Sequence, residues 1–274
     1  MSNTTICILG MHRSGTSCLA GSLQAAGLFA ESVAAWNEDN LKGNRENRDI
    51  MEANNSLLSY NGSSWDNPPR GKLVWSAEHV KKRDRTINRF NAQSTAWMFK
   101  DPRTLLSLPF WQEGFSQAGN ALLFVGTFRQ PIKVALSLYQ RSQIPLDEGI
   151  SLWIHYNQKL LELFRVKPFP IVCFDLPKNQ YKAQLCGLIN QLTVCLSGEH
   201  PLSKSAAQEF YSEDLVSYQE NITFLDFEEG LDIPVQIEKD TLKATAEALY
   251  QELCAVTQVQ LPDTEPVQKL SLPL

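Results

Sequence analysis

Several features that mark particular protein classes are missing from this sequence of 274 residues. None of its six cysteines belongs to a Cys-x-x-Cys pair or has the spacing of a metal site, so we expect reduced thiols, mostly in the core. No apolar run approaches the length that crosses a membrane, and no basic leader precedes the first strand-like segment. The formal net charge is −5, which argues against general nucleic-acid binding. We therefore expect a soluble, cytoplasmic protein without a metal centre, a membrane span or a nucleic-acid partner.

Internal repeats and low-complexity tracts are missing as well. The hydrophobic fraction of 43% is enough for one substantial core, so we expect residues 1–274 to form a single domain. Beyond about residue 197 the periodic patterns weaken, and a helix over 239–256 is the clearest element there. That C-terminal part is expected to be mostly helical, and no pattern in the sequence sets the oligomeric state.

Short apolar segments alternate with amphipathic segments over most of the chain. Strands are predicted at 5–9, 95–99, 121–128 and 169–174. Helices are predicted at 17–26, 47–60, 78–93, 104–117, 131–143, 147–165 and 179–193. Such alternation is typical of a parallel sheet that is covered on both faces. We expect an α/β fold of the P-loop type, with three layers and a central parallel sheet flanked by helices; the charged helix at 78–93 is expected to present a solvated face.

The first strand is followed by a loop suited to an anion. The run Gly10-Met-His-Arg-Ser-Gly-Thr-Ser17 has the glycine spacing of a P-loop, in which backbone N–H groups and a helix N-terminus surround an oxyanion. A nucleoside-triphosphate P-loop has Lys after the second glycine, whereas this chain has Thr16, and the nearest cation is Arg13. The loop is therefore predicted to hold an anion other than a γ-phosphate.

Two further strand ends carry cations. Lys100 begins the turn Lys-Asp-Pro-Arg after the second strand, and Arg129 ends the third strand, eight residues before Ser137. Because the carboxyl ends of parallel strands meet at one edge of a sheet, we expect these cations and Arg13 to form one polyanion site. Taken alone, Arg129 and Ser137 are equally compatible with a surface Arg and an ordinary helical Ser.

These motifs together resemble those of sulfotransferases that use 3′-phosphoadenosine-5′-phosphosulfate (PAPS). The resemblance extends from Ile6 to about Leu176 and is strongest to bacterial members with a Gly-Met-His-Arg-Ser-Gly-Thr-Ser loop. It implies transfer of a sulfuryl group from PAPS, as co-substrate, to a hydroxyl acceptor, in line and without a metal ion. The acceptor is expected to be a small molecule or a glycan, although a lipid, a phenol or a peptide hydroxyl would also fit.

The resemblance implies roles for individual residues. The 5′-phosphosulfate would be held by Arg13, Ser14, Gly15, Thr16 and Ser17. The 3′-phosphate would be held by Arg129 and Ser137. Lys100 lies in a Lys-Asp-Pro segment similar to that of protein-tyrosine sulfotransferases, in which the Lys assists the leaving group, and Phe174-Asp175-Leu176 resembles a later strand end of the family. The resemblance assigns no residue to the adenine.

A base is needed for the acceptor proton, and we favour Glu46 because it lies in a loop just ahead of a helix near the expected cleft. Glu31 is the alternative, and a purely structural Glu46, placed by the helix dipole, is equally compatible with the pattern. Arg13 and Lys100 complete the predicted catalytic set, since they can stabilise charge on the transferring group and the leaving phosphate. His12 beside an anion is expected to be protonated and to act indirectly.

Some segments depart from the family. The bacterial relatives usually carry an aromatic residue in a Gly-x-x-Glu-Asn segment, whereas residues 43–47 here are Gly-Asn-Arg-Glu-Asn. No Gly-rich late motif follows Ser197. Candidate residues for an acceptor pocket, which are equally suited to a core or its rim, are Trp36, Trp65 and Trp111.

Two other functions remain compatible with the sequence. The first is a P-loop nucleotide kinase or NTPase; Thr16 argues against it, as does a strand that ends in Arg129 rather than in an acidic Mg²⁺ ligand. The second is a nucleotide-binding module without catalysis. The presence of both Glu46 and Lys100 favours an enzyme over such a module.

Overall fold

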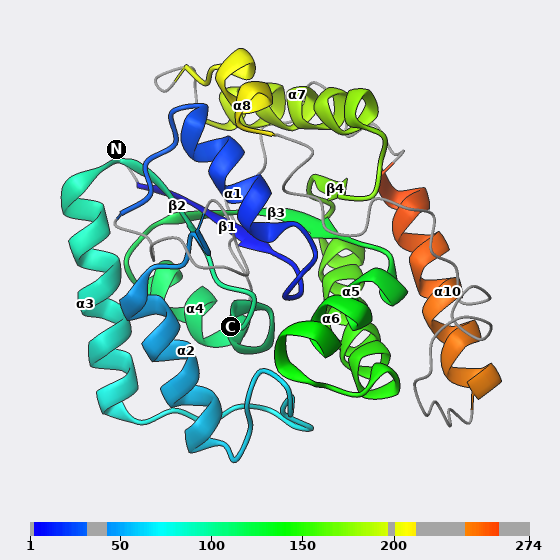
Figure 1. The fold of residues 1–274 in the computed structure, drawn as a ribbon. Coiled ribbons are helices and arrows are strands. Elements are labelled where there is room, and N and C mark those ends of the chain that lie inside the picture. The colour runs from blue at the N-terminus through cyan, green and yellow to red at the C-terminus, as the bar shows by residue number, and fades with distance from the viewer. Residues whose placement is uncertain (1–2, 32–42, 197–200, 212–238, 258–274) are drawn as a thin grey trace.

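The computed structural model describes residues 3–31, 43–196, 201–211 and 239–257. In this part of the chain, four parallel strands form one sheet in the order β2-β1-β3-β4 (Figure 1). The strands are β1 (Thr4–Leu9), β2 (Ala96–Lys100), β3 (Ala121–Phe128) and β4 (Ile171–Cys173). All four predicted strands are confirmed. Strand β4 starts at Ile171 rather than at the predicted residue 169, after Pro170, which has no N–H to donate to the ladder, and it ends one residue before the predicted 174.

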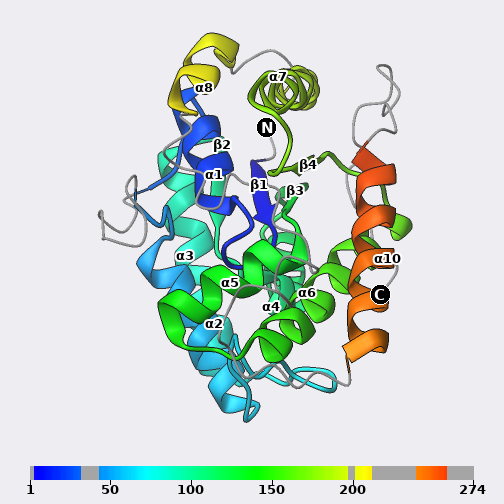
Figure 2. The ribbon, with the colours of Figure 1, turned by 45° about the vertical axis from the view of Figure 1, so that its right-hand side comes forward.

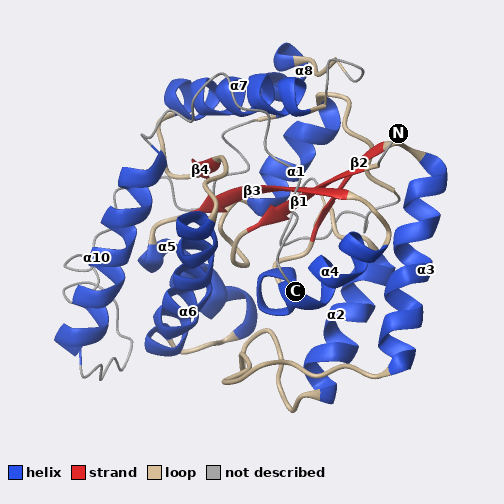
Figure 3. Ribbon diagram, turned by 180° about the vertical axis from the view of Figure 1, so that it is seen from behind, coloured by secondary structure: helices blue, strands red, loops and turns tan. Residues whose placement is uncertain are grey.

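Helices cover both faces of the sheet (Figures 2 and 3). They are α1 (Thr16–Ala25), α2 (Arg48–Tyr60), α3 (Ala77–Gln93), α4 (Thr104–Gln117), α5 (Pro131–Ser142), α6 (Leu146–Val166), α7 (Lys178–Cys195), α8 (Lys204–Phe210) and α10 (Lys239–Thr257). Helices α1, α7 and α8 pack on one face, and α2 to α6 with α10 pack on the other. The expected three-layer α/β fold is confirmed. The short α8 was not predicted, since seven residues carry too little apolar periodicity.

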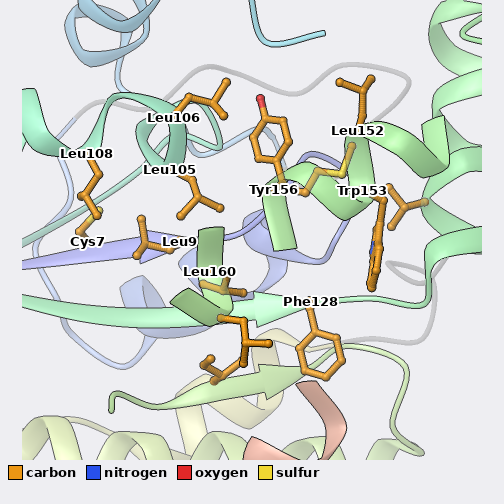
Figure 4. Close-up of a cluster of buried hydrophobic side chains, with 14 of the residues drawn as sticks. Cys7, Leu9, Leu105, Leu106, Leu108, Phe128, Leu152, Trp153, Tyr156 and Leu160 are labelled. Carbon is orange, nitrogen blue, oxygen red and sulfur yellow. The ribbon is translucent and has the colours of Figure 1, made fainter. Parts of the chain in front are cut away.

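Strand β1 supplies both hydrophobic cores. Its side chains alternate, so that Ile6 and Ile8 join the core under α1 and α7 while Cys7 and Leu9 join the larger core on the other face. Figure 4 shows Leu9 beside side chains of α4 and α6 in that larger core. The first strand is thus the rigid centre from which the following loop projects.

Helix α3 has the expected solvated face, on which Glu78, Lys81, Lys82 and Arg85 are exposed, but one of its charged residues, Arg83, departs from it. Arg83 is fully buried, and its guanidinium donates to the carbonyl of Phe110 at 2.8 Å and to Gln117 Oε1 at 3.0 Å. A Cβ at Gly114 would lie 2.3 Å from Arg83 Nε, so the glycine in α4 makes the space for this side chain. Such a contact between two distant helices leaves no mark on the periodicity of either.

The strand order brings the predicted site together. Strand β1 pairs with β2 on one side and with β3 on the other, with Ile8 opposite Lys100 and Leu9 opposite Gly126. The direction of chain progression therefore reverses at β1, and this is the point at which open α/β sheets bind ligands. The loop after β1, the end of β2 and the end of β3 meet at this edge.

The loop at residues 10–15, called the anion loop below, is shaped by two close approaches. A Cβ at Gly10 would lie 2.5 Å from the carbonyl oxygen of Thr127 in β3. Gly15 has φ +82°, and a Cβ there would lie 2.4 Å from the ring of Phe174. Glycine is needed at both positions because neighbouring strand ends pack directly against the loop.

We predict that Gly15→Ala destabilises the protein more than Gly62→Ala. Both glycines have positive φ, which costs an L-residue about 1–2 kcal/mol. A Cβ at Gly62 meets nothing within 4 Å, so the additional cost at Gly15, about 1–3 kcal/mol, measures overpacking against Phe174. Urea unfolding of the two variants gives the comparison, and equal losses would show that Phe174 does not constrain the loop.

Candidate functional site

The anion loop joins β1 to the N-terminus of α1. The hydroxyl of Thr127 donates to the carbonyl of Ser14 at 3.1 Å, which ties the loop to β3. No side chain in the described part of the chain caps α1, and the buried Ser14 hydroxyl has no hydrogen-bond partner there. Uncapped N–H groups at a helix start and an unsatisfied hydroxyl are donors suited to an oxyanion.

Arg13 and Ser137 are in direct contact. Arg13 lies in the anion loop with φ +65°, and its Nε donates to Ser137 Oγ at 2.6 Å. Ser137 lies on α5 and is buried. The sequence assigned these two residues to different phosphates. The structure brings them together, because the Arg13 side chain is long enough to reach from the loop to α5.

Arg129 lies at the end of β3, where it is held by the end of β4. Its Nε is 3.4 Å from Asp175 Oδ1, and its guanidinium lies 5.6 Å from the centre of the Phe174 ring. Lys133 Nζ is also 3.4 Å from Asp175 Oδ1. Since Phe174 also packs on Gly15, the end of β4 joins the two predicted phosphate sites. Lys133 was missed, although its position on the first turn of α5 after Arg129 could have indicated it.

Lys100 and Glu46 form a buried ion pair beside α1. Lys100 Nζ lies 2.9 Å from Glu46 Oε1 and 3.3 Å from Ser17 Oγ. Local structure fixes both partners: Lys100 is the last residue of β2, and Glu46 immediately precedes Asn47, whose side chain caps α2. The structure therefore brings the two predicted catalytic residues into contact next to the anion loop.

Two charged residues around this ion pair were not assigned from the sequence. Arg103 Nη1 lies 3.5 Å from Glu46 Oε2 and 3.0 Å from Asp101 Oδ1. Both residues belong to the charged turn after β2, which was the signal that could have found them. Glu46 is thus held between two cations, one on each carboxylate oxygen.

These cations set the ionisation of Glu46. Burial alone would raise the pKa of its carboxyl, but the charges and hydrogen bonds of Lys100 and Arg103 outweigh burial and hold the pKa below its usual range. Burial lowers the pKa of Lys100, and Glu46 opposes that effect. Burial raises the pKa of Asp101, against the charge of Arg103. Glu46 is therefore an anion at neutral pH, and a weak base while both cations remain on it.

Glu31, the alternative base, lies in a different network. Its carboxylate pairs with Arg89 at 2.5 Å and accepts from Asn47 at 3.1 Å and from Gln93 at 3.0 Å. These contacts tie residue 31 to α3 and to the start of α2 rather than to the anion loop. The geometry therefore favours Glu46.

The protein's own residues favour the neutral form of His12, whereas the expectation that it is protonated concerns a bound anion and stays a prediction. Burial, followed by the charges of Arg103, Lys100, Arg141 and Arg13, lowers the pKa of its imidazole well below the usual value. The ring packs 4.7 Å from the ring of Trp65, measured between centroids. Burial and four surrounding cations disfavour a further positive charge on this ring, and a bound anion would oppose the effect of those cations.

The candidate tryptophans lie in different surroundings. Trp65 contacts the anion loop through His12, whereas Trp111 is fully buried and donates to Asn54 at 2.7 Å, so it belongs to the core. Trp36 lies outside the described residues.

The six cysteines are thiols, of which Cys7, Cys18 and Cys173 are buried and the other three are half-buried.

Within the described ranges, no cluster of three or more His, Cys, Asp or Glu side chains is arranged to hold a metal ion. None of the helices described there has the length and apolar character to cross a membrane.

We predict that the free energy contributed by the Glu46 ion pair is lost in acid. The folded pKa of Glu46 lies below the unfolded value of about 4.3, so the contribution is complete above that pH and falls as the pH drops through the folded pKa. At pH 7, Glu46→Gln should cost about 3 kcal/mol, the lower end of the cost of breaking a buried pair.

Urea unfolding of both proteins between pH 7 and pH 3 tests this. Glu52→Gln is the matched control, because Glu52 pairs with Arg48 on the exposed surface, where ion pairs contribute little to stability. A difference between wild type and Glu46→Gln that does not narrow in acid would contradict the assigned direction of the pKa.

Comparison with known proteins bears on the fold. No protein-family model matches the chain, and no curated protein does. Among solved structures, the chain is similar to the sulfotransferase domain of the olefin synthase from Synechococcus PCC 7002, with 17% sequence identity and a TM-score of 0.50. The match covers 96% of this chain and 98% of that domain. At this identity the likeness concerns the fold, and we conclude that the chain has a sulfotransferase-like fold.

Proposed function

We propose that the protein is a PAPS-dependent sulfotransferase that acts on a hydroxyl group of a small molecule or a glycan. The observation that carries the proposal is the buried Lys100–Glu46 ion pair, whose lysine also contacts Ser17, beside a loop that leads into an uncapped helix. A loop of this kind suits a phosphosulfate, and the adjacent cation and carboxylate suit transfer to an acceptor. The sulfotransferase-like fold is compatible with this arrangement.

In this proposal PAPS lies along the carboxyl edge of the sheet. The 5′-phosphosulfate is held by the anion loop and the start of α1, through Arg13, Ser14, Gly15, Thr16 and Ser17. The 3′-phosphate is held by Arg129 and Ser137. The contact between Arg13 and Ser137 supports one continuous site, because it joins a residue assigned to the 5′-phosphosulfate with one assigned to the 3′-phosphate.

The proposed reaction exchanges one sulfur–oxygen bond for another. The acceptor oxygen attacks sulfur as the bond to the 5′-phosphate oxygen breaks, the SO₃ group passes to the acceptor, and 3′,5′-adenosine bisphosphate leaves. Lys100 and Arg13 stabilise the negative charge that develops on the leaving phosphate and the SO₃ group. Glu46 takes the acceptor proton.

The ion pair links these two events. Glu46 is a weak base while Lys100 donates to it, but Lys100 also lies within 3.3 Å of Ser17 at the start of α1. As Lys100 turns its charge toward the leaving phosphate, the carboxylate loses a neighbour that lowers its pKa, and its basicity rises. Arg103, which contacts the other carboxylate oxygen, keeps Glu46 oriented.

We predict that Arg129→Ala weakens binding of 3′,5′-adenosine bisphosphate by about 1.5–3 kcal/mol, the scale of a hydrogen bond to a charged group. Binding of 5′-AMP, which lacks the 3′-phosphate, should change far less. Calorimetry with both ligands provides the measurement, and Arg48→Ala on the exposed surface of α2 is the control. Equal losses for the two nucleotides would remove the assignment of Arg129 to the 3′-phosphate.

We predict that sulfuryl transfer from PAPS continues in excess EDTA and that the protein does not hydrolyse ATP. A γ-phosphoryl donor concentrates charge that P-loop enzymes neutralise with Mg²⁺ and a Lys after the second glycine, where this chain has Thr16. A sulfuryl group carries less charge, which Arg13, Lys100 and backbone N–H groups are sufficient to balance.

The assay combines labelled PAPS, a panel of hydroxyl acceptors and a parallel ATPase measurement with Mg²⁺. Mg²⁺-dependent ATP turnover that disappears in Arg13→Ala, together with no affinity for PAPS, would establish the kinase or NTPase alternative instead. PAPS binding without transfer to any acceptor would favour the non-catalytic module.

A further inference from the structure

A groove of about 720 Å³ lies apart from the residues assigned to PAPS. It is bounded by residues 69–75, by α4 and by α6, and Figure 3 shows these two helices on the same side of the sheet. Its apolar walls include Leu105, Leu106 and Leu108 of α4, Leu163 of α6 and Trp75. Leu105, Leu106 and Leu108 are no more than 4% exposed, so the walls reach into the body of the protein. We call this the α4–α6 groove.

The charges around the α4–α6 groove are unbalanced. The described residues that line it include three cations, Arg70, Lys72 and Lys159, but only one carboxylate, that of Glu162. His155 also lines the groove, and its Nε2 is buried without a hydrogen-bond partner in the described part of the chain. A buried polar atom without a partner is unfavourable unless a ligand or water supplies one. The groove therefore combines apolar walls with excess positive charge and an unused polar atom.

We propose that the α4–α6 groove binds one small amphiphilic anion, a molecule with an apolar chain or ring and an acidic group. The chain lies against the leucines, and the acidic group lies among Arg70, Lys72 and Lys159, within reach of His155. The volume is within the range of about 300–1,000 Å³ found for small-molecule sites. Because the groove lies between residues 69–75, α4 and α6, it is concave and suits a single molecule better than the surface of a flat bilayer.

The α4–α6 groove is connected to the anion loop through one segment. Trp65, a few residues before the groove wall, packs on His12, and its carbonyl accepts from the hydroxyl of Tyr156 at 2.8 Å. Tyr156 adjoins His155 on α6. A ligand in the groove thus contacts the segment and the helix that pack against the anion loop. The binding itself does not depend on the proposed sulfuryl transfer.

Octyl phosphate below its micelle-forming concentration is a suitable probe for calorimetry on the full chain. It should bind with one site, and Lys159→Glu should weaken binding at least 10-fold, because the variant places a second carboxylate beside Glu162. Lys81→Glu makes the same charge change on the exposed surface of α3 and should bind like wild type. Leu163→Asp should likewise weaken binding at least 10-fold, because it places a carboxylate on the apolar wall, whereas Val194→Asp on the exposed surface of α7 should not change binding.

Two further binding measurements distinguish octyl phosphate in the α4–α6 groove from octyl phosphate in the anion loop or on a purely apolar surface. Arg13→Ala should retain octyl phosphate binding; loss of binding in that variant would place the probe in the anion loop and overturn the proposal. Octyltrimethylammonium should bind at least 10-fold more weakly than octyl phosphate. Equal binding of the two amphiphiles, unchanged binding in both groove variants, or no binding of octyl phosphate to wild type would each overturn it.

Discussion

The buried ion pair between Lys100 and Glu46 is the interaction on which the edge of the sheet depends. It joins the end of β2 to the segment before α2, and through Ser17 it reaches the start of α1. Burying two charges costs several kcal/mol per ion, and their attraction only partly offsets that cost. A hydrophobic pair of similar volume would serve stability as well. Retaining two charges beside an anion-binding loop therefore fits a chemical role better than a structural one.

Asp175 has a comparable position on the other side of the loop. It holds Arg129 and Lys133, while Phe174 beside it packs on Gly15. The cations at this edge are thus positioned by neighbouring carboxylates and rings before any ligand binds. Preorganised charge of this kind stabilises a transition state without the cost of reorienting side chains during the reaction.

The fold was predictable because its signals are local. Apolar runs, the glycine spacing around Arg13 and Pro131 at the start of α5 each specify one element without reference to the rest of the chain. From alternating strands and helices, the parallel sheet and its ligand-binding edge follow. The strand ends therefore gave the correct edge for Lys100 and Arg129.

The pairing of charges was not predictable, since it depends on contacts between distant segments. Nothing in the sequence shows that Arg103 shares Glu46 with Lys100, or that Arg83 is buried over Gly114. For the same reason the surroundings of His12 were not foreseen: the ring is buried, and the cations that further lower its pKa come from several separate segments. The sequence thus identified residues whose side chains can take part in binding or catalysis, and the structure supplied their partners.

The most direct test of the central claim compares single-turnover sulfuryl transfer in wild type and Glu46→Gln, with the affinity for 3′,5′-adenosine bisphosphate measured on the same samples. Gln keeps the shape of Glu but cannot accept the acceptor proton. The account predicts that transfer falls by about 10²-fold or more while nucleotide affinity changes little. Full transfer activity in Glu46→Gln would contradict this prediction, because Glu46 would then not be the base that takes the acceptor proton.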